Sequence, residues 1–281
     1  DGAILKTNTN GTTVSGTNSE GAFSIHNHVA DNVLLENGGH LDINAYGSAN
    51  KTIIKDKGTM SVLTNAKADA TRIDNGGVMD VAGNATNTIA TGTNINSGTQ
   101  NIKSGGKADT TIISSGSRQV VEKDGTAIGS NISAGGSLIV YTGGIAHGVN
   151  QETGSALVAN TGAGTDIEGY NKLSHFTITG GEANYVVREN TGELTVVAKT
   201  SAKNTTIDTG GKLIVQKEAK TDSTRLNNGG VLEVQDGGEA KHVEQQSGGA
   251  LIASTTSGTL IEGTNSYGDA FYIRNSEAKN V

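Results

Sequence analysis

The chain has 281 residues and a formal net charge of −7, and it contains 41 Gly but no Pro, Cys or Trp. The negative charge and the absence of a Lys/Arg run argue against a nucleic-acid partner or insertion at an anionic membrane, and the lack of Cys excludes disulfides and thiolate metal sites. Aromatic residues make up 3%, too few for an ordinary globular core, so aliphatic side chains and Thr must form the core.

One phrase of about nineteen residues recurs along the chain, for example over 127–145 and again over 202–220. In each copy a short strand ending in Ile is followed by Gly-Gly and a second strand of the form Leu-x-Val. A fixed period of this size is typical of a solenoid, in which one coil cannot bury its apolar face alone. We therefore predict an all-β fold, a parallel β-helix solenoid of roughly fifteen coils, right-handed by the chirality of crossover connections.

The coils can be followed in order from their leading residue, which is nearly always Ala. The leading residues are Ala30, Ala49, Ala68, Ala90, Ala108, Ala127, Ala146, Ala183, Ala202, Thr221 and Ala240. The first apolar ladder is Leu35, Ile54, Ile73, Ile95, Ile113, Ile132, Ile207 and Leu226. A Thr often stands two residues before the ladder position, and this spacing predicts that it faces inward. An ice-binding Thr face is therefore not expected. A short insertion is expected around Asn87–Ile89.

Three segments depart from the simple coil in the same way, at 12–29, 165–182 and 259–277. Each reads Thr-x-x-x-Gly-x-Asn and then Phe-x-Ile, and together they hold all three Phe of the chain. We interpret them as specialised coils with protruding turns or hairpins, each anchored by a buried Phe, within a single β-helix that covers 1–281. They are either spacers that reset the coil or elements of recognition.

The sequence predicts no catalytic residues, no cofactor and no metal site. The outward position after the first ladder changes in type from coil to coil, as Glu36, Lys55 and Asp74 show, so no acidic strip is formed. An enzyme is not expected, and the alternative is a carbohydrate-active β-helix enzyme such as a polysaccharide lyase or depolymerase. His26 and His28 share a predicted strand face and could pair on a metal, but a solvated face is the expectation.

The outward surface is rich in Ser, Thr and Asn, which suits either pairing between rods or attachment of O-linked sugar. Serines in predicted turns would be accessible to a transferase. The candidates for O-glycosylation are Ser104, Ser115, Ser133, Ser137, Ser155, Ser247 and Ser257.

The repeat over 68–81 (ADATRIDNGGVMDV) resembles the passenger repeats of self-associating autotransporter adhesins, the AIDA, TibA and antigen-43 group of Gram-negative bacteria. The first specialised segment, from Gly11 to Asn18 and on through Phe23, resembles the longer motif of that group. Within the group, TibA is the most similar.

This resemblance implies a glycoprotein at the bacterial cell surface that is exported through an outer-membrane barrel. It implies host-cell adhesion, autoaggregation, biofilm formation and virulence, and heptose added to Ser by a dedicated heptosyltransferase. The expected partners are a second copy on another cell and a host receptor or glycan. The chain shows no signal peptide or barrel and stops within a coil at Val281, so we expect a segment of a longer rod.

Overall fold

The computed structural model describes residues 4–83 and 88–281, so the insertion expected around Asn87–Ile89 lies partly outside the described residues. The chain divides into two compact units. Unit 1 comprises residues up to 139 together with 144–149, and unit 2 comprises 140–143 together with 150–281. Every regular element in the described residues is a β-strand. Among those residues, none forms a helix of the length and apolarity that a membrane crossing needs.

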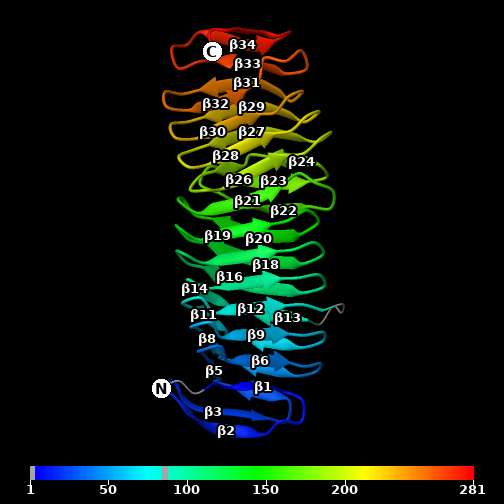
Figure 1. Cartoon of the computed structure of the whole chain (residues 1–281), viewed down its shortest axis with the longest axis vertical. Helices are drawn as coiled ribbons and strands as arrows, with labels where there is room; N and C mark the ends of the chain where they lie inside the picture. The colour runs from blue at the N-terminus through cyan, green and yellow to red at the C-terminus, as the bar shows by residue number, and fades with distance from the viewer. Residues whose placement is uncertain (1–3, 84–87) are drawn as a thin grey trace. The chain divides into compact units, whose positions relative to one another are not determined.

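In unit 1, two sets of strands run along the coils (Figure 1). The first set is β1 (Lys6–Asn8), β6 (His40–Ile43), β9 (Thr59–Val62), β12 (Val78–Val81), β15 (Thr99–Ile102), β17 (Arg118–Val121) and β19 (Ser137–Val140). The second set is β4 (Val29–Asp31), β5 (Leu34–Leu35), β7 (Ser48–Asn50), β8 (Ile53–Ile54), β10 (Lys67–Asp69), β11 (Arg72–Asp74), β13 (Ile89–Thr91), β14 (Asn94–Asn96), β16 (Lys107–Ile113), β18 (Thr126–Ile132) and β20 (Ile145–Gln151). The last residues of β19 and β20 belong to unit 2.

Unit 2 repeats this arrangement. Its first set is β21 (Ala156–Asn160), β26 (Glu193–Val196), β28 (Lys212–Val215), β30 (Val231–Val234) and β32 (Ala250–Ala253). Its second set is β24 (Glu182–Asn184), β25 (Val187–Arg188), β27 (Ser201–Ile207), β29 (Lys220–Leu226), β31 (Glu239–Gln245) and β35 (Glu277–Lys279).

Within each unit, equivalent positions of the repeat pair in parallel. Leu213 faces Leu232 across β28 and β30, and Ile113 faces Ile132 across β16 and β18, so the register there advances by nineteen residues. In unit 1 the step differs at β14, where Arg72 faces Asn94 and Asn94 faces Ile112. The apolar ladder, the leading Ala and the inward Thr are all buried, which confirms the predicted core. The buried Thr at this position are Thr52, Thr71, Thr93, Thr111, Thr205 and Thr224.

Each coil bends once inside the second set of strands, at a residue in the left-handed region. The bend falls on a residue that is often not Gly, as at Lys51 (φ 53°), Ala70 (φ 51°) and Asn204 (φ 51°). Its N–H still donates to the neighbouring coil, for example from Lys51 to the carbonyl of Asp69 (3.0 Å). The ladder of hydrogen bonds therefore continues around the bend and helps hold a conformation that an L-residue rarely adopts.

The described residues make about twelve turns, because unit 1 supplies seven strands of the first set and unit 2 supplies five. The expectation of roughly fifteen coils was too high. That number assumed that all residues build parallel coils, whereas part of the chain forms antiparallel hairpins that add no strand to the first set.

The hairpins coincide with the three specialised segments. They are β2 (Val14–Asn18) with β3 (Gly21–His26), β22 (Asp166–Tyr170) with β23 (His175–Thr179), and β33 (Leu260–Thr264) with β34 (Ala270–Arg274). In each hairpin the second strand then pairs antiparallel with the strand that starts the next coil, namely β4, β24 or β35.

The recurring Gly, Phe and Asn of these segments have clear roles. The Gly lies directly opposite the Phe in all three hairpins, and a Cβ on Gly16 would lie 3.0 Å from the ring of Phe23. The Asn closes the hairpin turn with its side-chain oxygen, and its amide donates to the bend residue of the following coil. In the second hairpin, Asn171 donates to the carbonyl of Tyr185 at 2.8 Å.

Candidate functional site

Four of the seven candidate serines lie at exposed turns between strands. Ser115 and Ser247 are in the turn that follows the bent strand, and Ser104 and Ser257 are in the turn that follows the first-set strand. These four hydroxyls are open to a modifying enzyme. Ser133 and Ser137 flank a turn and are half-buried.

Ser155 is not accessible, and the expectation for this residue was wrong. It is 0% exposed, and its hydroxyl donates to the carbonyl of Glu152 at 2.6 Å. Ser155 stands at the second Gly position of the turn, where Gly192 and Gly211 stand in later coils. A Cβ on Gly211 would lie 2.0 Å from a backbone oxygen, so this position faces inward.

Ser97 is an exposed turn serine that was not among the candidates. Because Thr99 pairs with Arg118, Ser97 stands at the position that Gly116 occupies in the next coil, and both residues have a left-handed φ (64° and 74°). Aligning the turns rather than the strands would have found it in the sequence.

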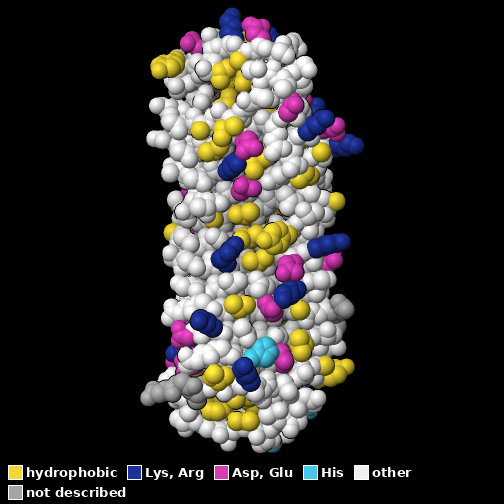
Figure 2. All heavy atoms as spheres, viewed as in Figure 1, with side chains coloured by type: hydrophobic (Ala, Val, Ile, Leu, Met, Phe, Trp, Pro, Cys, Tyr) yellow, Lys and Arg dark blue, Asp and Glu magenta, His cyan; other side chains and the backbone are white. Residues whose placement is uncertain are grey.

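The described residues contain no His, Asp and Glu group that could hold a metal ion. His26 lies in β3, but His28 lies in the turn after it with a φ of 65°, so the two do not share a strand face as the sequence suggested. On the face drawn in Figure 2, acidic and basic side chains are interspersed rather than gathered into one patch. Many of them pair between neighbouring coils, such as Lys212 with Glu233 (2.7 Å).

Polar residues that the sequence analysis did not single out interrupt the apolar core. In unit 1, Gln100 and Gln119 form a buried network in which the amide of Gln119 donates to Gln100 (2.8 Å) and Ser130 donates to Gln119 (2.6 Å). In unit 2, Arg188 is fully buried at the ladder position, with a single hydrogen bond to the carbonyl of Val187 (2.9 Å). Burial lowers the pKa of Arg188 to about 9.

A cluster of ion pairs connects the turn of the second hairpin to the two coils that follow it. Lys172, in the hairpin turn, contacts Glu189 (2.8 Å) and Asp208 (2.6 Å) on two successive coils. Burial alone would lower the pKa of Lys172, but the hydrogen bonds to these carboxylates raise it. For Asp208, burial favours a higher pKa, yet the bonds from Lys172 and Asn227 lower it overall.

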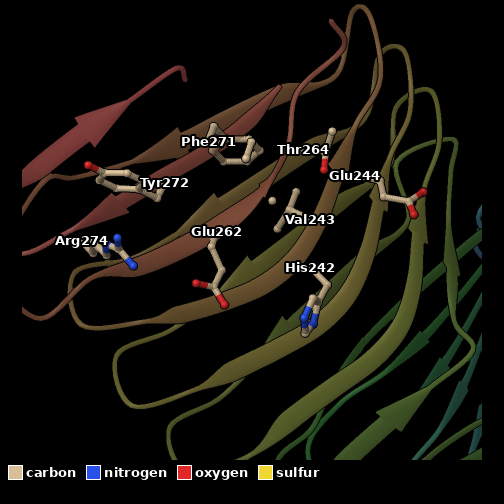
Figure 3. Close-up of a pocket in the computed structure, with 10 residues that line it drawn as sticks. His242, Val243, Glu244, Glu262, Thr264, Phe271, Tyr272 and Arg274 are labelled. Atoms are coloured by element: carbon tan, nitrogen blue, oxygen red, sulfur yellow. The ribbon is translucent and has the colours of Figure 1, made fainter. Parts of the chain in front are cut away.

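A pocket of about 470 Å³ lies beside the third hairpin (Figure 3). One wall comes from β31 and the other from the hairpin strands β33 and β34. It is lined by His242, Val243, Glu244, Glu262, Gly263, Thr264, Ala270, Phe271, Tyr272 and Arg274. Val243 and Phe271 are buried beneath its surface, and the half-buried Tyr272 is the aromatic side chain of the lining.

The polar side chains of this pocket come together through the strand register. Glu244 faces Thr264 across β31 and β33, and Glu262 faces Tyr272 across β33 and β34. The guanidinium of Arg274 lies 4.3 Å from the ring centre of Tyr272. The sequence analysis did not predict this pocket, because a register shift between Ala240 and Val243 brings these residues together.

The family model described as "Adhesin of bacterial autotransporter system, probable stalk" matches residues 15–77 and 168–230. Both matches begin in the first strand of a hairpin and end at a Gly-Gly turn. The two matched segments therefore have the same architecture, one in each unit.

Two curated relatives are autotransporters. The chain is 95% identical to "Probable autotransporter YpjA" of Escherichia coli (strain K12) over its whole length, and spans 19% of that protein. It is 48% identical over 62 residues to "Autotransporter CRAC" of Citrobacter rodentium, which covers 22% of the chain and 4% of that protein.

A solved structure of a hyper-glycosylated TibA fragment, whose glycosylation is catalysed by TibC, matches with a TM-score of 0.50 and 29% identity. The match covers 82% of the chain and 84% of the fragment. The chain belongs to the AIDA and TibA group of autotransporter adhesin passengers.

Proposed function

We propose that the chain is part of a cell-surface passenger that attaches bacteria to host cells or surfaces and to one another, and so promotes aggregation and biofilm formation. Membership of the adhesin passenger group carries the proposal and implies an extracellular location at the cell surface. The mechanism is avidity, since many weak contacts on repeated coils add to a strong attachment. Right-handed winding of the coils and export through a barrel formed elsewhere in the protein belong to the same proposal.

The test of the adhesive function uses bacteria that display the passenger that contains this segment. Displaying cells should settle faster and bind more strongly to host cells than cells that display a passenger lacking 150–281. Equal settling and equal attachment would contradict the proposal.

We also propose that exposed turn serines carry O-linked heptose added by a dedicated heptosyltransferase. The supporting observations are the glycosylated state of the matching TibA fragment and the exposure of Ser104, Ser115, Ser247 and Ser257. Intact mass after co-expression with a heptosyltransferase should rise in regular sugar-sized increments.

Serine variants make the test of heptosylation more specific. Replacing the four exposed serines by Ala should remove increments, whereas Ser155→Ala should leave the mass distribution unchanged because Ser155 is buried. An unmodified mass for the parent chain would contradict heptosylation.

The alternative of a carbohydrate-active enzyme is not favoured. The group to which the chain belongs points to adhesion, and the outward position after the first ladder varies in type between coils, where Lys55 pairs with Glu36 (3.3 Å) instead of stacking carboxylate on carboxylate. Turnover of a polysaccharide by the purified chain would reverse this preference.

A further inference from the structure

The pocket beside the third hairpin is lined by two carboxylates that have no hydrogen-bond partner among the described residues. Glu244 is exposed and Glu262 is half-buried, and neither carboxylate forms a hydrogen bond or ion pair with another described residue. The pocket also borders two smaller hollows, of about 140 Å³ and 330 Å³, and Glu244 lines all three. The result is a groove of a size that binds small ligands.

The charged side chains that line the groove indicate which class of ligand it can bind. Glu244 and Glu262 are free acceptors, while the ring of His242 is already paired with Asp222, whose carboxylate lies 2.6 Å away. Arg274 is the one full positive charge that lines the main pocket. Arg225 lines the hollow of about 140 Å³ beside it, where it donates to Asn227. In the main pocket the two carboxylates outnumber the one guanidinium, which disfavours an anionic ligand and favours one that is uncharged or positively charged.

The chemistry of the lining suits a sugar ring. Carboxylates and a guanidinium form paired hydrogen bonds with adjacent hydroxyl groups. The half-buried ring of Tyr272, which lines the pocket, offers contact to the C–H face of a sugar ring. A bound peptide strand is less suitable, because β31, β33 and β34 are each paired on both sides and leave no free edge for it.

We propose that this pocket is a saccharide-binding site that takes an uncharged or amino-bearing sugar residue. The proposal rests on the adhesive function and adds a ligand class to it. Glu262 and Glu244 accept hydrogen bonds from hydroxyl or amino groups, Arg274 donates to a ring or hydroxyl oxygen, and Thr264 lies at the mouth toward the neighbouring hollow.

The first hairpin provides a natural control for this site. The position before its conserved Gly is Ser15 instead of Glu262, and the positions after its Phe are Ser24 and His26 instead of Tyr272 and Arg274. A triple variant with Glu262→Ser, Tyr272→Ser and Arg274→His therefore keeps side chains that a hairpin of this type already accepts.

The experiment titrates the 281-residue chain with four probes in ligand-observed NMR. The probes are methyl galactoside, N-acetylglucosamine, glucosamine and N-acetylneuraminic acid, and trilysine serves as a peptide competitor. At least one of the first three should bind saturably. Glu262→Gln should weaken that binding about tenfold, as expected for losing a charged hydrogen-bond partner, and the triple variant should abolish it.

Glu218→Gln is the matched control, because it makes the same charge change at an exposed turn outside the pocket and should leave binding unchanged. The proposal is overturned if none of the first three probes binds, if only N-acetylneuraminic acid or trilysine binds, or if the triple variant binds as the parent does. If the triple variant does not fold, the affinity of the Glu262→Gln variant tests the proposal instead, and an affinity equal to that of the parent would overturn it. Absence of sugar binding with normal cell aggregation would reject the site and leave the adhesive function standing.

Discussion

Single threonines in the core differ in how well their hydroxyls are satisfied. The hydroxyl of Thr111 donates to Gln100 at 3.3 Å, whereas that of Thr52 is buried without a hydrogen-bond partner. Both occupy the same position of the repeat, and Val33 and Val243 occupy it in other coils. The backbone therefore accepts either Thr or Val at this position, and the neighbouring side chains determine which of the two gives the more stable protein.

We expect Thr52→Val to stabilise the protein by about 1 kcal/mol, because it removes a buried hydroxyl that has no partner. Thr111→Val should destabilise it by about 1–2 kcal/mol, because Gln100 loses a donor. Denaturant midpoints at constant slope measure both changes. Destabilisation by Thr52→Val, or no change in Thr111→Val, would refute this explanation.

Arg188 is the least favourable residue of the core, since a cation is buried without an acidic partner. Leu35 and Ile207 occupy the same position of the repeat elsewhere. We expect Arg188→Leu to stabilise the fold by at least about 2 kcal/mol. Arg225→Leu, at an exposed position, should change stability by less than about 0.5 kcal/mol.

The gain from Arg188→Leu should also depend on pH. Because burial lowers the pKa of Arg188 to about 9, the folded parent binds fewer protons than the unfolded chain between about pH 9 and its ordinary pKa. The free energy of unfolding of the parent therefore rises with pH in this range, and the difference in stability between the Arg188→Leu variant and the parent becomes smaller. Urea melts at pH 7 and pH 10 test this, and a constant difference would contradict it.

Sequence reasoning was most successful where the repeat sets the environment. The period predicted that Ile113 and Thr111 face inward, because alternation along a strand fixes the face. It did not predict the core role of Arg188, whose type contradicts its ladder position, or the burial of Ser155, which depends on aligning the turn with its Gly-Gly equivalents. In both cases the polar side chain suggested a position on the surface, whereas the register of the repeat places the residue inside.

The hairpins are elements whose stability depends on contacts outside the repeat. Lys172 ties the second hairpin to Glu189 and Asp208, while the first hairpin has Ser19 at the corresponding position and the third has Ser266. The turn of the first hairpin has a longer and more exposed ion pair, between Glu20 and Arg72 (3.7 Å). The second hairpin is therefore the one whose turn is anchored by a lysine that contacts two carboxylates.

We expect Lys172→Met to destabilise unit 2 by about 1 kcal/mol near neutral pH. Asp208 has a lowered pKa, so its contribution is complete above its ordinary value of 3.8 and is lost as pH falls through the lower folded value. Lys172 has a raised pKa, so its contribution is lost only as pH rises above its ordinary value of 10.5. The difference between variant and parent should thus be largest from about pH 5 to 10.

Thermal melts of both proteins at pH 2.5, 7 and 9 measure this difference. Ser266→Met in the third hairpin is a control, because no ion pair is lost there and the melting temperature should stay nearly constant with pH relative to the parent. An equal effect of Lys172→Met at pH 2.5 and pH 7 would show that packing, not charge, anchors the hairpin.

The recurrence of Gly, Asn and Phe indicated where these segments lie and that each forms a protruding turn or a hairpin, but it did not distinguish between the two. The opposition of Gly16 and Phe23 requires antiparallel pairing, which a parallel repeat gives no reason to expect. The same limit applies to the pocket at Glu262, since it forms only where β33 shifts register against β31.

For the whole molecule, net charge governs how copies approach one another. Two copies that each carry −7 repel at long range. If short-range contacts join them, association should strengthen as salt rises from about 10 mM to about 150 mM, because the screening length falls from about 30 Å to about 8 Å. Sedimentation velocity of the chain at both salt concentrations measures this, and weaker association at the higher concentration would point instead to complementary charged patches.

The nineteen-residue register has a consequence for how such genes change. Thr205 pairs with Thr224 and Ile207 with Leu226, so excising or duplicating one whole repeat would present each remaining N–H with an equivalent carbonyl. Recombination between repeats can therefore lengthen or shorten the protein in single-coil steps without disturbing its folding. Asn94 pairs with Ile112, eighteen residues later, so a coil one residue shorter also keeps its ladder. A deletion inside a strand, in contrast, would leave donors and acceptors out of step, and selection should remove it.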